Sequence, residues 1–173
     1  MYSKPVGKKL IAYLFVFSLL ARLLIIAIVP TPALDDSAQI YLRAAHFLMD
    51  GKGFSDPAFP VYNPPLYPVF IAASLSFLGD DLISVSIVQA LVDSFTTILV
   101  YLVMREIFDV EAALLSAILA GLYPFSLYLT NSIASVPLFT FFCSGFLLCF
   151  VYAVCSIKWR YYSVSGVLLG IAT

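Results

Sequence analysis

Long apolar stretches constrain the fold of this chain more than any other feature of its sequence. Four of them reach the length of about 20 residues that a helix needs to cross a bilayer: 10–29, 82–104, 112–130 and 133–157. Only 11% of the residues are charged, so a soluble fold has too little polar material to cover this apolar surface. The sequence therefore predicts an all-α polytopic membrane protein in a lipid bilayer. It excludes a soluble domain, a disordered tail and a nucleic-acid-binding protein.

Two further apolar segments are shorter. Residues 161–173 look like the start of a partial fifth crossing, and they end without a cap or a charged flank. We therefore expect the chain to be the N-terminal part of a longer polypeptide. Residues 66–79 suit an interfacial or re-entrant helix better than a crossing, because fourteen residues fall short of the bilayer thickness.

The charge distribution favours one large outside loop, residues 30–81. If 66–79 does not cross, this loop contains six of the ten acidic residues. The basic residues near the other helix ends then all lie in the cytoplasm, where Lys and Arg are in excess: Lys4, Lys8, Lys9, Arg105, Lys158 and Arg160. We predict four complete crossings, with the N-terminus in the cytoplasm.

An amphipathic helix on the membrane surface is predicted at residues 37–50 of this loop. Asp36 can cap its N-terminus, with Gln39 three residues later as in a capping box, and Gly51 suits the position after its end. Apolar side chains recur on one side at helical spacing. The polar side chains on the opposite side are Gln39, Arg43, His46 and Asp50.

Asp35 and Asp36 are the first candidates for chemistry in this loop. Two adjacent carboxylates at the bilayer interface can act as a general base toward a hydroxyl, or bind a divalent cation. The alternative is structural, because aspartate is common at helix starts, where it caps the first turn. His46 has a similar alternative as a solvated residue beside Arg43, since no second metal ligand is spaced to join it.

Arg22 and Asp93 lie inside two of the predicted crossings. An ionisable side chain within the membrane is costly and usually faces a partner or a water-filled cavity. The two residues can pair with each other, or Asp93 can accept hydrogen bonds from neighbouring hydroxyl groups. A structural intramembrane pair and a functional role both stay open.

One ordered series of residues carries a family resemblance: Arg22, Asp35-Asp36, Tyr41, Ala45, Leu48, GKGF at 51–54, YNPPLYP at 62–68, Gly79, Gln89, Tyr101, Arg105, Phe108, Tyr123-Pro124 and 166–173. In order and spacing, this series resembles the N-terminal part of the class C membrane glycosyltransferases. That group contains the protein O-mannosyltransferases, which are dolichyl-phosphate-mannose-protein mannosyltransferases, and the bacterial aminoarabinose transferase for lipid A. The resemblance extends over nearly the whole chain.

The resemblance implies a class C glycosyltransferase-like transmembrane bundle and a transferase, of hexosyl or mannosyl type, that takes its sugar from a polyprenyl phosphate. In that family an acidic residue after the first crossing is the proposed base, so the matching positions are Asp35 and Asp36, and which one acts stays open. The same two residues are the candidate ligands of Mg or Mn, the only cofactor left open. The further candidate substrate-binding residues are Arg43, His46, Tyr62 and Asn63.

The resemblance also implies the cytoplasmic (inner) membrane, an active face on the outside and an acceptor hydroxyl of unknown identity. The family holds its donor phosphate in later helices, so we expect these residues to be inactive alone. The competing interpretation is a non-enzymatic membrane scaffold or transporter fragment, with Arg22 and Asp93 as a structural or ion-path pair. The loop favours the enzyme, because a scaffold has no need of an amphipathic helix led by two carboxylates.

Overall fold

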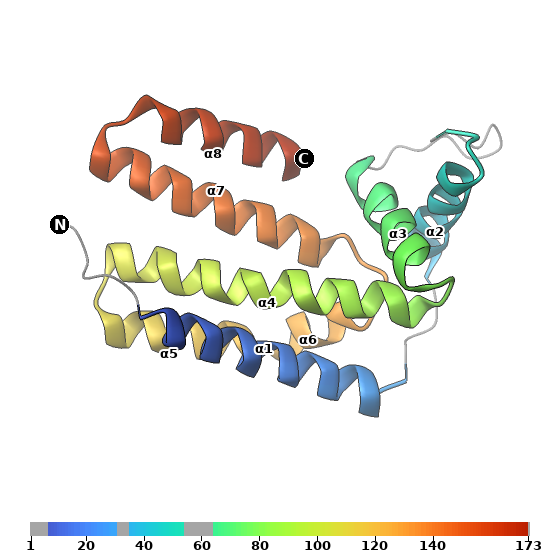
Figure 1. Ribbon diagram of the computed structural model, residues 1–173, viewed down its shortest axis with the longest axis horizontal. Coiled ribbons are helices and arrows are strands. Elements are labelled where there is room, and N and C mark those ends of the chain that lie inside the picture. Colours follow the sequence, from blue (N-terminus) through green and yellow to red (C-terminus); the bar gives the residue numbers. More distant parts are fainter. Residues whose placement is uncertain (1–6, 31–34, 54–63, 173) are drawn as a thin grey trace.

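The computed structural model describes residues 7–30, 35–53 and 64–172, and the secondary structure in these ranges is helical throughout (Figure 1). The eight helices found there are α1 (Lys8–Ile28), α2 (Asp36–Met49), α3 (Leu66–Leu78), α4 (Leu82–Ile107), α5 (Val110–Gly121), α6 (Pro124–Thr130), α7 (Val136–Ser156) and α8 (Trp159–Ala172). Together with their apolar composition, this architecture confirms the predicted all-α polytopic membrane fold.

Helices α1, α4, α5, α7 and α8 lie side by side, and α2 and α3 form a hairpin at one end of this bundle (Figure 1). The long helix α4 is central, since it contacts α1, α5 and α7 along the bundle and α3 in the hairpin. The hairpin lies in the chain between the end of α1 and the start of α4. It therefore occupies the end of the bundle at which α1 finishes and α4 and α7 begin.

The membrane-spanning elements follow the apolar stretches closely. In the described part of the chain, α1, α4 and α7 are each long and apolar enough to cross a bilayer, and the bent pair α5–α6 counts as a fourth if it forms one span. The chain is thus a multi-pass membrane protein. Helix α3 is apolar but has only 13 residues, which agrees in length with the predicted interfacial or re-entrant segment. The number of complete crossings and their sidedness stay predictions.

The third predicted crossing, 112–130, is not one continuous helix. Pro124 has no backbone N–H and cannot continue α5, so the helix ends at Gly121 and the chain resumes as α6 after a bend of 47°. This break frees the carbonyl oxygen of Gly121, which accepts a hydrogen bond of 3.2 Å from Nη1 of Arg22 on α1. A neighbouring helix thus satisfies the interrupted backbone, as a membrane interior requires.

The N-cap of α2 is Asp35, and the prediction that Asp36 caps this helix was wrong. Asp35 has extended backbone angles (φ −74°, ψ 172°), and its Oδ1 accepts the backbone N–H of Ala38 at 2.7 Å. Asp36 is already inside the first helical turn, where its negative charge still interacts favourably with the helix dipole. The helix accordingly begins one residue earlier than predicted.

The end of α2 follows the expected pattern at Gly51. This glycine has φ +73°, a left-handed conformation that costs a glycine nothing. Its N–H bonds the carbonyl of Leu48 at 3.0 Å, and the N–H of Lys52 bonds that of Phe47 at 2.9 Å. These two bonds form a Schellman motif that ends the helix sharply.

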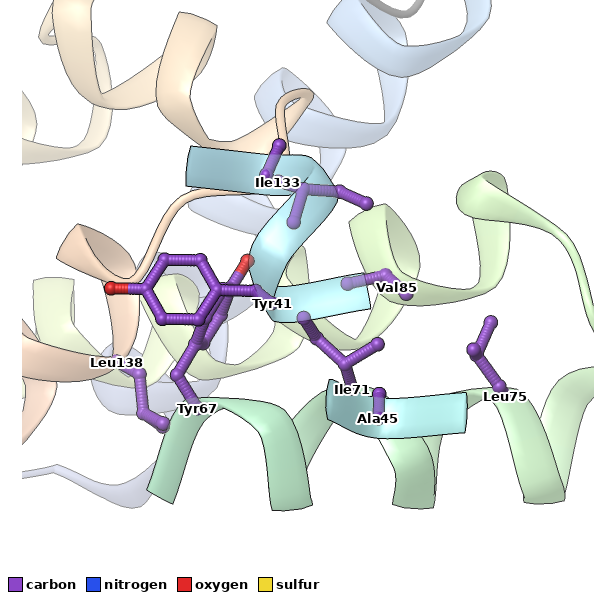
Figure 2. Packing of buried hydrophobic residues seen from close by; sticks show 9 residues of the cluster. Tyr41, Ala45, Tyr67, Ile71, Leu75, Val85, Ile133 and Leu138 are labelled. Atoms are coloured by element: carbon purple, nitrogen blue, oxygen red, sulfur yellow. The ribbon is translucent and has the colours of Figure 1, made fainter. Parts of the chain in front are cut away.

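The hairpin has a core of its own, formed where α2 and α3 pack together and against α4 and α7 (Figure 2). Ala45 of α2 and Ile71 of α3 are both fully buried. The ring of Tyr41 meets the ring of Tyr67 edge to face, with 4.9 Å between their centroids. Val85 and Leu138 close the cluster from α4 and α7. The hairpin is therefore held on the bundle by apolar contacts as well as by the chain.

Candidate functional site

Asp35 and Asp36 lie at the start of α2, a few residues beyond the end of α1, and both are exposed. The capping bond uses Oδ1 of Asp35. Both carboxylates lie at the positive end of the α2 dipole, with which negative charge interacts favourably. This arrangement places two charged, accessible carboxylates at the hairpin end of the bundle. It suits a group that must meet a substrate from outside the helix core.

His46 and Arg43 lie farther along the same helix. At a rise of 1.5 Å per residue, His46 is about 15 Å and Arg43 about 10 Å beyond Asp36 along the axis. Arg43 is exposed. His46 instead faces the turn between α3 and α4, with its Nε2 3.9 Å from Oδ1 of Asp80. The structure thus places His46 away from the two carboxylates rather than gathering them into one cluster.

The predicted substrate-binding residues Tyr62 and Asn63 lie outside the described residues.

A divalent cation is also predicted at Asp35 and Asp36. In the ranges that the structure describes, no group of three or more His, Cys, Asp or Glu side chains is placed to hold a metal ion. The described donors at this point are therefore two carboxylates, which is an incomplete ligand set for Mg²⁺ or Mn²⁺. We derive no catalytic step through a cation.

Arg22 and Asp93 form a buried ion pair between α1 and α4. Arg22 is 1% exposed, and its Nε and Nη2 donate to Oδ2 of Asp93 at 2.9 Å and 2.7 Å. The same oxygen accepts the hydroxyls of Ser126 and Thr130 from α6. Nη1 of Arg22 also donates to the backbone and the hydroxyl of Ser18. The pair joins α1, α4 and α6, and its charges compensate each other inside the bundle.

A second buried polar junction centres on Gln89 of α4, which the sequence analysis named only as part of the family series. Its Oε1 accepts the hydroxyl of Tyr67 at 2.6 Å. Its Nε2 donates to the carbonyl oxygens of Thr130 at 3.1 Å and Ser132 at 2.7 Å. Burial raises the pKa of the Tyr67 hydroxyl well above its usual range, so this group stays a donor. The one available signal was a lone amide inside an apolar run.

The segment between α6 and α7, residues 131–135, which we call the α6–α7 connector, joins both junctions. Asn131 is buried, and its Nδ2 donates to the carbonyl of Val29 at the end of α1, at 3.0 Å. The carbonyl of Ser132 accepts the bond of 2.7 Å from Nε2 of Gln89, whose Oε1 accepts from Tyr67. The side chain of Ile133 enters the hairpin core beside Tyr41 (Figure 2). The connector therefore contacts elements on both sides of Asp35 and Asp36 in the chain.

A small cavity of about 130 Å³ opens at the same end of the bundle. Its walls come from the start of α3, the first turns of α7 and the end of α8, and most of its surface is apolar. The side chains that close it include Leu66, Tyr67, Leu138, Phe139 and Phe142. It can hold a short hydrocarbon segment, but the described residues that line it include no charged side chain that would bind a phosphate.

Comparison with known proteins assigns the chain to a family. A family model described as dolichyl-phosphate-mannose-protein mannosyltransferase matches residues 62–173, well over half of the chain. The match includes Tyr67, Gln89 and Asp93, and it begins after Asp35 and Asp36. No curated protein and no solved structure matches the chain. This chain, a multi-pass helical bundle with this match, therefore belongs to the dolichyl-phosphate-mannose-protein mannosyltransferase family of glycosyltransferases.

Proposed function

We propose that this chain carries the acceptor-activating residues of a membrane glycosyltransferase. The enzyme moves a sugar from a polyprenyl-phosphate donor to an acceptor hydroxyl on the outer face of the inner membrane. The observation that carries this proposal is the position of Asp35 and Asp36. They are two exposed carboxylates at the point where a spanning helix of a mannosyltransferase-family chain gives way to the hairpin.

The proposed step uses one carboxylate as a general base. It takes the proton of the acceptor hydroxyl while that oxygen forms a bond to the anomeric carbon. The bond between the anomeric carbon and the donor phosphate oxygen breaks, and the polyprenyl phosphate departs with the electron pair. Attack from the face opposite the phosphate inverts the anomeric configuration. A base for this step must be able to reach the acceptor's proton, which fits an exposed carboxylate.

The position of the basic residues supports an outward-facing site. Lys8 and Lys9 begin α1, and Lys158 and Arg160 lie where α7 turns into α8, so these charges are at the bundle end opposite the hairpin. Cytoplasmic ends of membrane proteins carry this excess of positive charge. The hairpin end, with its carboxylates, would then face outward, where an acceptor is reached without crossing the bilayer.

The apolar cavity supports a lipid-linked donor at the same end. Its lining of aliphatic and aromatic side chains suits part of a polyprenyl chain. Arg43, an exposed cation of α2 seven residues after Asp36, is our candidate for attracting the donor phosphate. The competing role of an ion path has weaker support, because Arg22 and Asp93 are buried and are bonded to each other.

The test compares Asp35→Asn, Asp36→Asn and the double variant in the complete polypeptide that carries residues 1–173. Asparagine caps a helix about as well as aspartate, so Asp35→Asn removes the base and keeps the cap. The purified enzyme in nanodiscs is given radiolabelled polyprenyl-phosphate mannose and a membrane extract as the source of acceptor. Loss of a general base should lower the transfer rate by roughly 10²–10⁴-fold in the variant that removes it.

The matched control is Asp80→Asn, which removes an exposed carboxylate from the same end of the molecule. It should leave transfer unchanged. Full transfer activity in both single variants and in the double variant would contradict the assignment of the base to this pair.

A further inference from the structure

We propose that Gln89 is a positioning residue for the site: through Tyr67 and the α6–α7 connector, its amide fixes α2, and with it Asp35 and Asp36, on the spanning bundle. The catalytic consequence rests on the proposed function. The placement of α2 does not, because it can be measured without any substrate.

The first step of the argument is the junction at Gln89 itself. This side chain is 1% exposed inside an apolar bundle, yet its three hydrogen bonds to described residues go to other elements rather than to its own helix. One bond reaches Tyr67 on α3, and two reach the backbone at Thr130 and Ser132. An amide is the one side-chain group that can accept from a hydroxyl and donate to two carbonyls at once. An apolar residue of similar size fills the space but leaves these groups unpaired.

The second step carries this constraint from α3 to α2. Tyr67 is 2% exposed, and its ring lies edge to face with that of Tyr41, at an interplanar angle of 88° (Figure 2). Tyr41 follows Asp35 by six residues within one helical unit. Because α2 is capped at one end and closed by Gly51 at the other, fixing Tyr41 fixes the helix that begins at Asp36.

The third step concerns the other side of the carboxylates. Asn131 of the connector holds the carbonyl of Val29, the C-cap residue of α1. The connector therefore holds the chain before the carboxylates, at Val29. After them it holds the chain at Tyr41, through Gln89 and Tyr67. Thr130 completes the circuit, since its hydroxyl donates to Asp93 at 3.1 Å while its carbonyl accepts from Gln89.

The experiment uses Gln89→Leu and Gln89→Glu in the complete polypeptide, with Thr96→Val as the matched control. Thr96 is a buried residue of the same helix, and its hydroxyl bonds the carbonyl of Val92 within α4. Spin labels at Ile28 and Ser37, both exposed, report the distance between the end of α1 and the start of α2. The native cysteines are replaced by alanine in every sample: Cys143, Cys149 and Cys155.

We expect Gln89→Leu to broaden the distribution of distances between the two labels, and Thr96→Val to leave it unchanged. In the transfer assay, Gln89→Leu should lower kcat by about tenfold or more, because small displacements of a catalytic group are costly. The KM for the donor should change by less than about twofold, since the ground-state contacts with the lipid stay in place. A residue that acts only in stability changes neither the distance nor the ratio of these constants.

Gln89→Glu adds a pH readout. At lower pH, where the introduced acid is protonated, it can still donate to a carbonyl while accepting from Tyr67, whereas its ionised form can only accept. Transfer should be close to that of the parent enzyme there and should fall as rising pH ionises the introduced group. A pH profile identical to that of the parent would count against the proposal.

Two outcomes overturn the inference. An unchanged label distribution in Gln89→Leu shows that Gln89 does not place α2, whatever the activity. A broadened distribution with unchanged kcat shows that the placement has no bearing on catalysis. If Asp35→Asn and Asp36→Asn retain full transfer, the proposed base is wrong instead, and the label distances alone then decide whether Gln89 positions α2.

Discussion

Removing the charge of Asp93 should destabilise the protein far more than removing one of its hydroxyl donors. Oδ2 of Asp93 accepts two hydrogen bonds from Arg22, together with those from Ser126 and Thr130. The variant Asp93→Asn keeps an oxygen that can accept these bonds. It leaves the guanidinium of Arg22, which is 1% exposed, without a counter-charge. The stability that Asp93→Asn loses therefore measures the contribution of the ion pair, separately from that of the hydrogen bonds.

The expected magnitudes separate the two effects. Stripping a buried ion of its partner costs about 3–5 kcal/mol. The control Thr130→Val removes the hydrogen bond that one uncharged hydroxyl donates to the same oxygen and leaves the ion pair in place, and side-chain hydrogen bonds between membrane helices average about 0.6 kcal/mol. For a chain of this size each kcal/mol shifts Tm by roughly 2–4 °C. Asp93→Asn should thus lower Tm by about 10 °C, and Thr130→Val by about 2 °C.

The assay is thermal unfolding of the detergent-solubilised protein, followed by circular dichroism of the helices. The double variant Arg22→Met with Asp93→Leu removes both charges and should recover most of the stability, because no unpaired ion is left. A Tm for Asp93→Asn as high as that of Thr130→Val would refute the reasoning. The reasoning would also be refuted if the Tm of the double variant fell by the sum of the losses measured for Arg22→Met and Asp93→Leu alone.

Three other measurements test other parts of the structure. Gly51→Ala should cost about 1 kcal/mol, because its φ of +73° strains any residue with a Cβ, although that Cβ would meet open space. Gly166→Ala, inside α8 and with open space around its Cβ, should not lower Tm, because alanine is the better helix former. An equal loss in both variants would argue against the turn at Gly51. Burial raises the pKa of Tyr67, so stability should be complete below about pH 10 and fall by up to about 1.4 kcal/mol per pH unit above it. Thermal unfolding of Tyr67→Phe should lack this alkaline component; an unaltered pH dependence would refute the assignment. Titration with Mn²⁺ should show no binding tighter than about 10⁻³ M in the absence of donor, because among the described residues no third metal-binding side chain joins Asp35 and Asp36. Micromolar binding that the double asparagine variant loses would overturn this expectation.

The spanning helices were predictable because length and apolarity are local properties of the sequence. The run 82–104 became α4, and the run 133–157 became α7, each within a few residues. The bend between α5 and α6 was less accessible, although Pro124 marked its position. Whether a proline kinks a membrane helix or breaks it depends on which donors bond the carbonyl groups that it leaves free. Here Arg22 donates to the freed carbonyl of Gly121, which lies 99 residues away in the chain.

In the candidate site, too, the sequence identifies individual residues but not the contacts between helices. Asp35 and Asp36 were identifiable because they follow an apolar run and precede an amphipathic helix. Arg22 and Asp93 were recognised as costly intramembrane charges, but their pairing depends on how α1 and α4 are rotated about their axes. Gln89 was harder, since a single amide in an apolar run does not reveal which of several elements it bonds. Sequence periodicity describes one helix at a time, whereas these contacts depend on several.

The polar side chains differ in whether they are buried and bonded or exposed, and this difference bears on which of them can react. In a membrane interior an unpaired polar group is expensive, so buried groups pair with one another. Asp93 receives four hydrogen bonds on one oxygen, two of them from a cation. Such a carboxylate is a poor base, because a base must reach an acceptor's proton and must not be quenched by a strong ion pair. Gln89, Asp93 and Thr130, which carry bonds of this kind, lie inside the family match, and we interpret them as a structural frame. Under the proposed function, the exposed carboxylates at the start of α2 meet the substrate, and their reactivity then depends on how firmly this frame holds the hairpin.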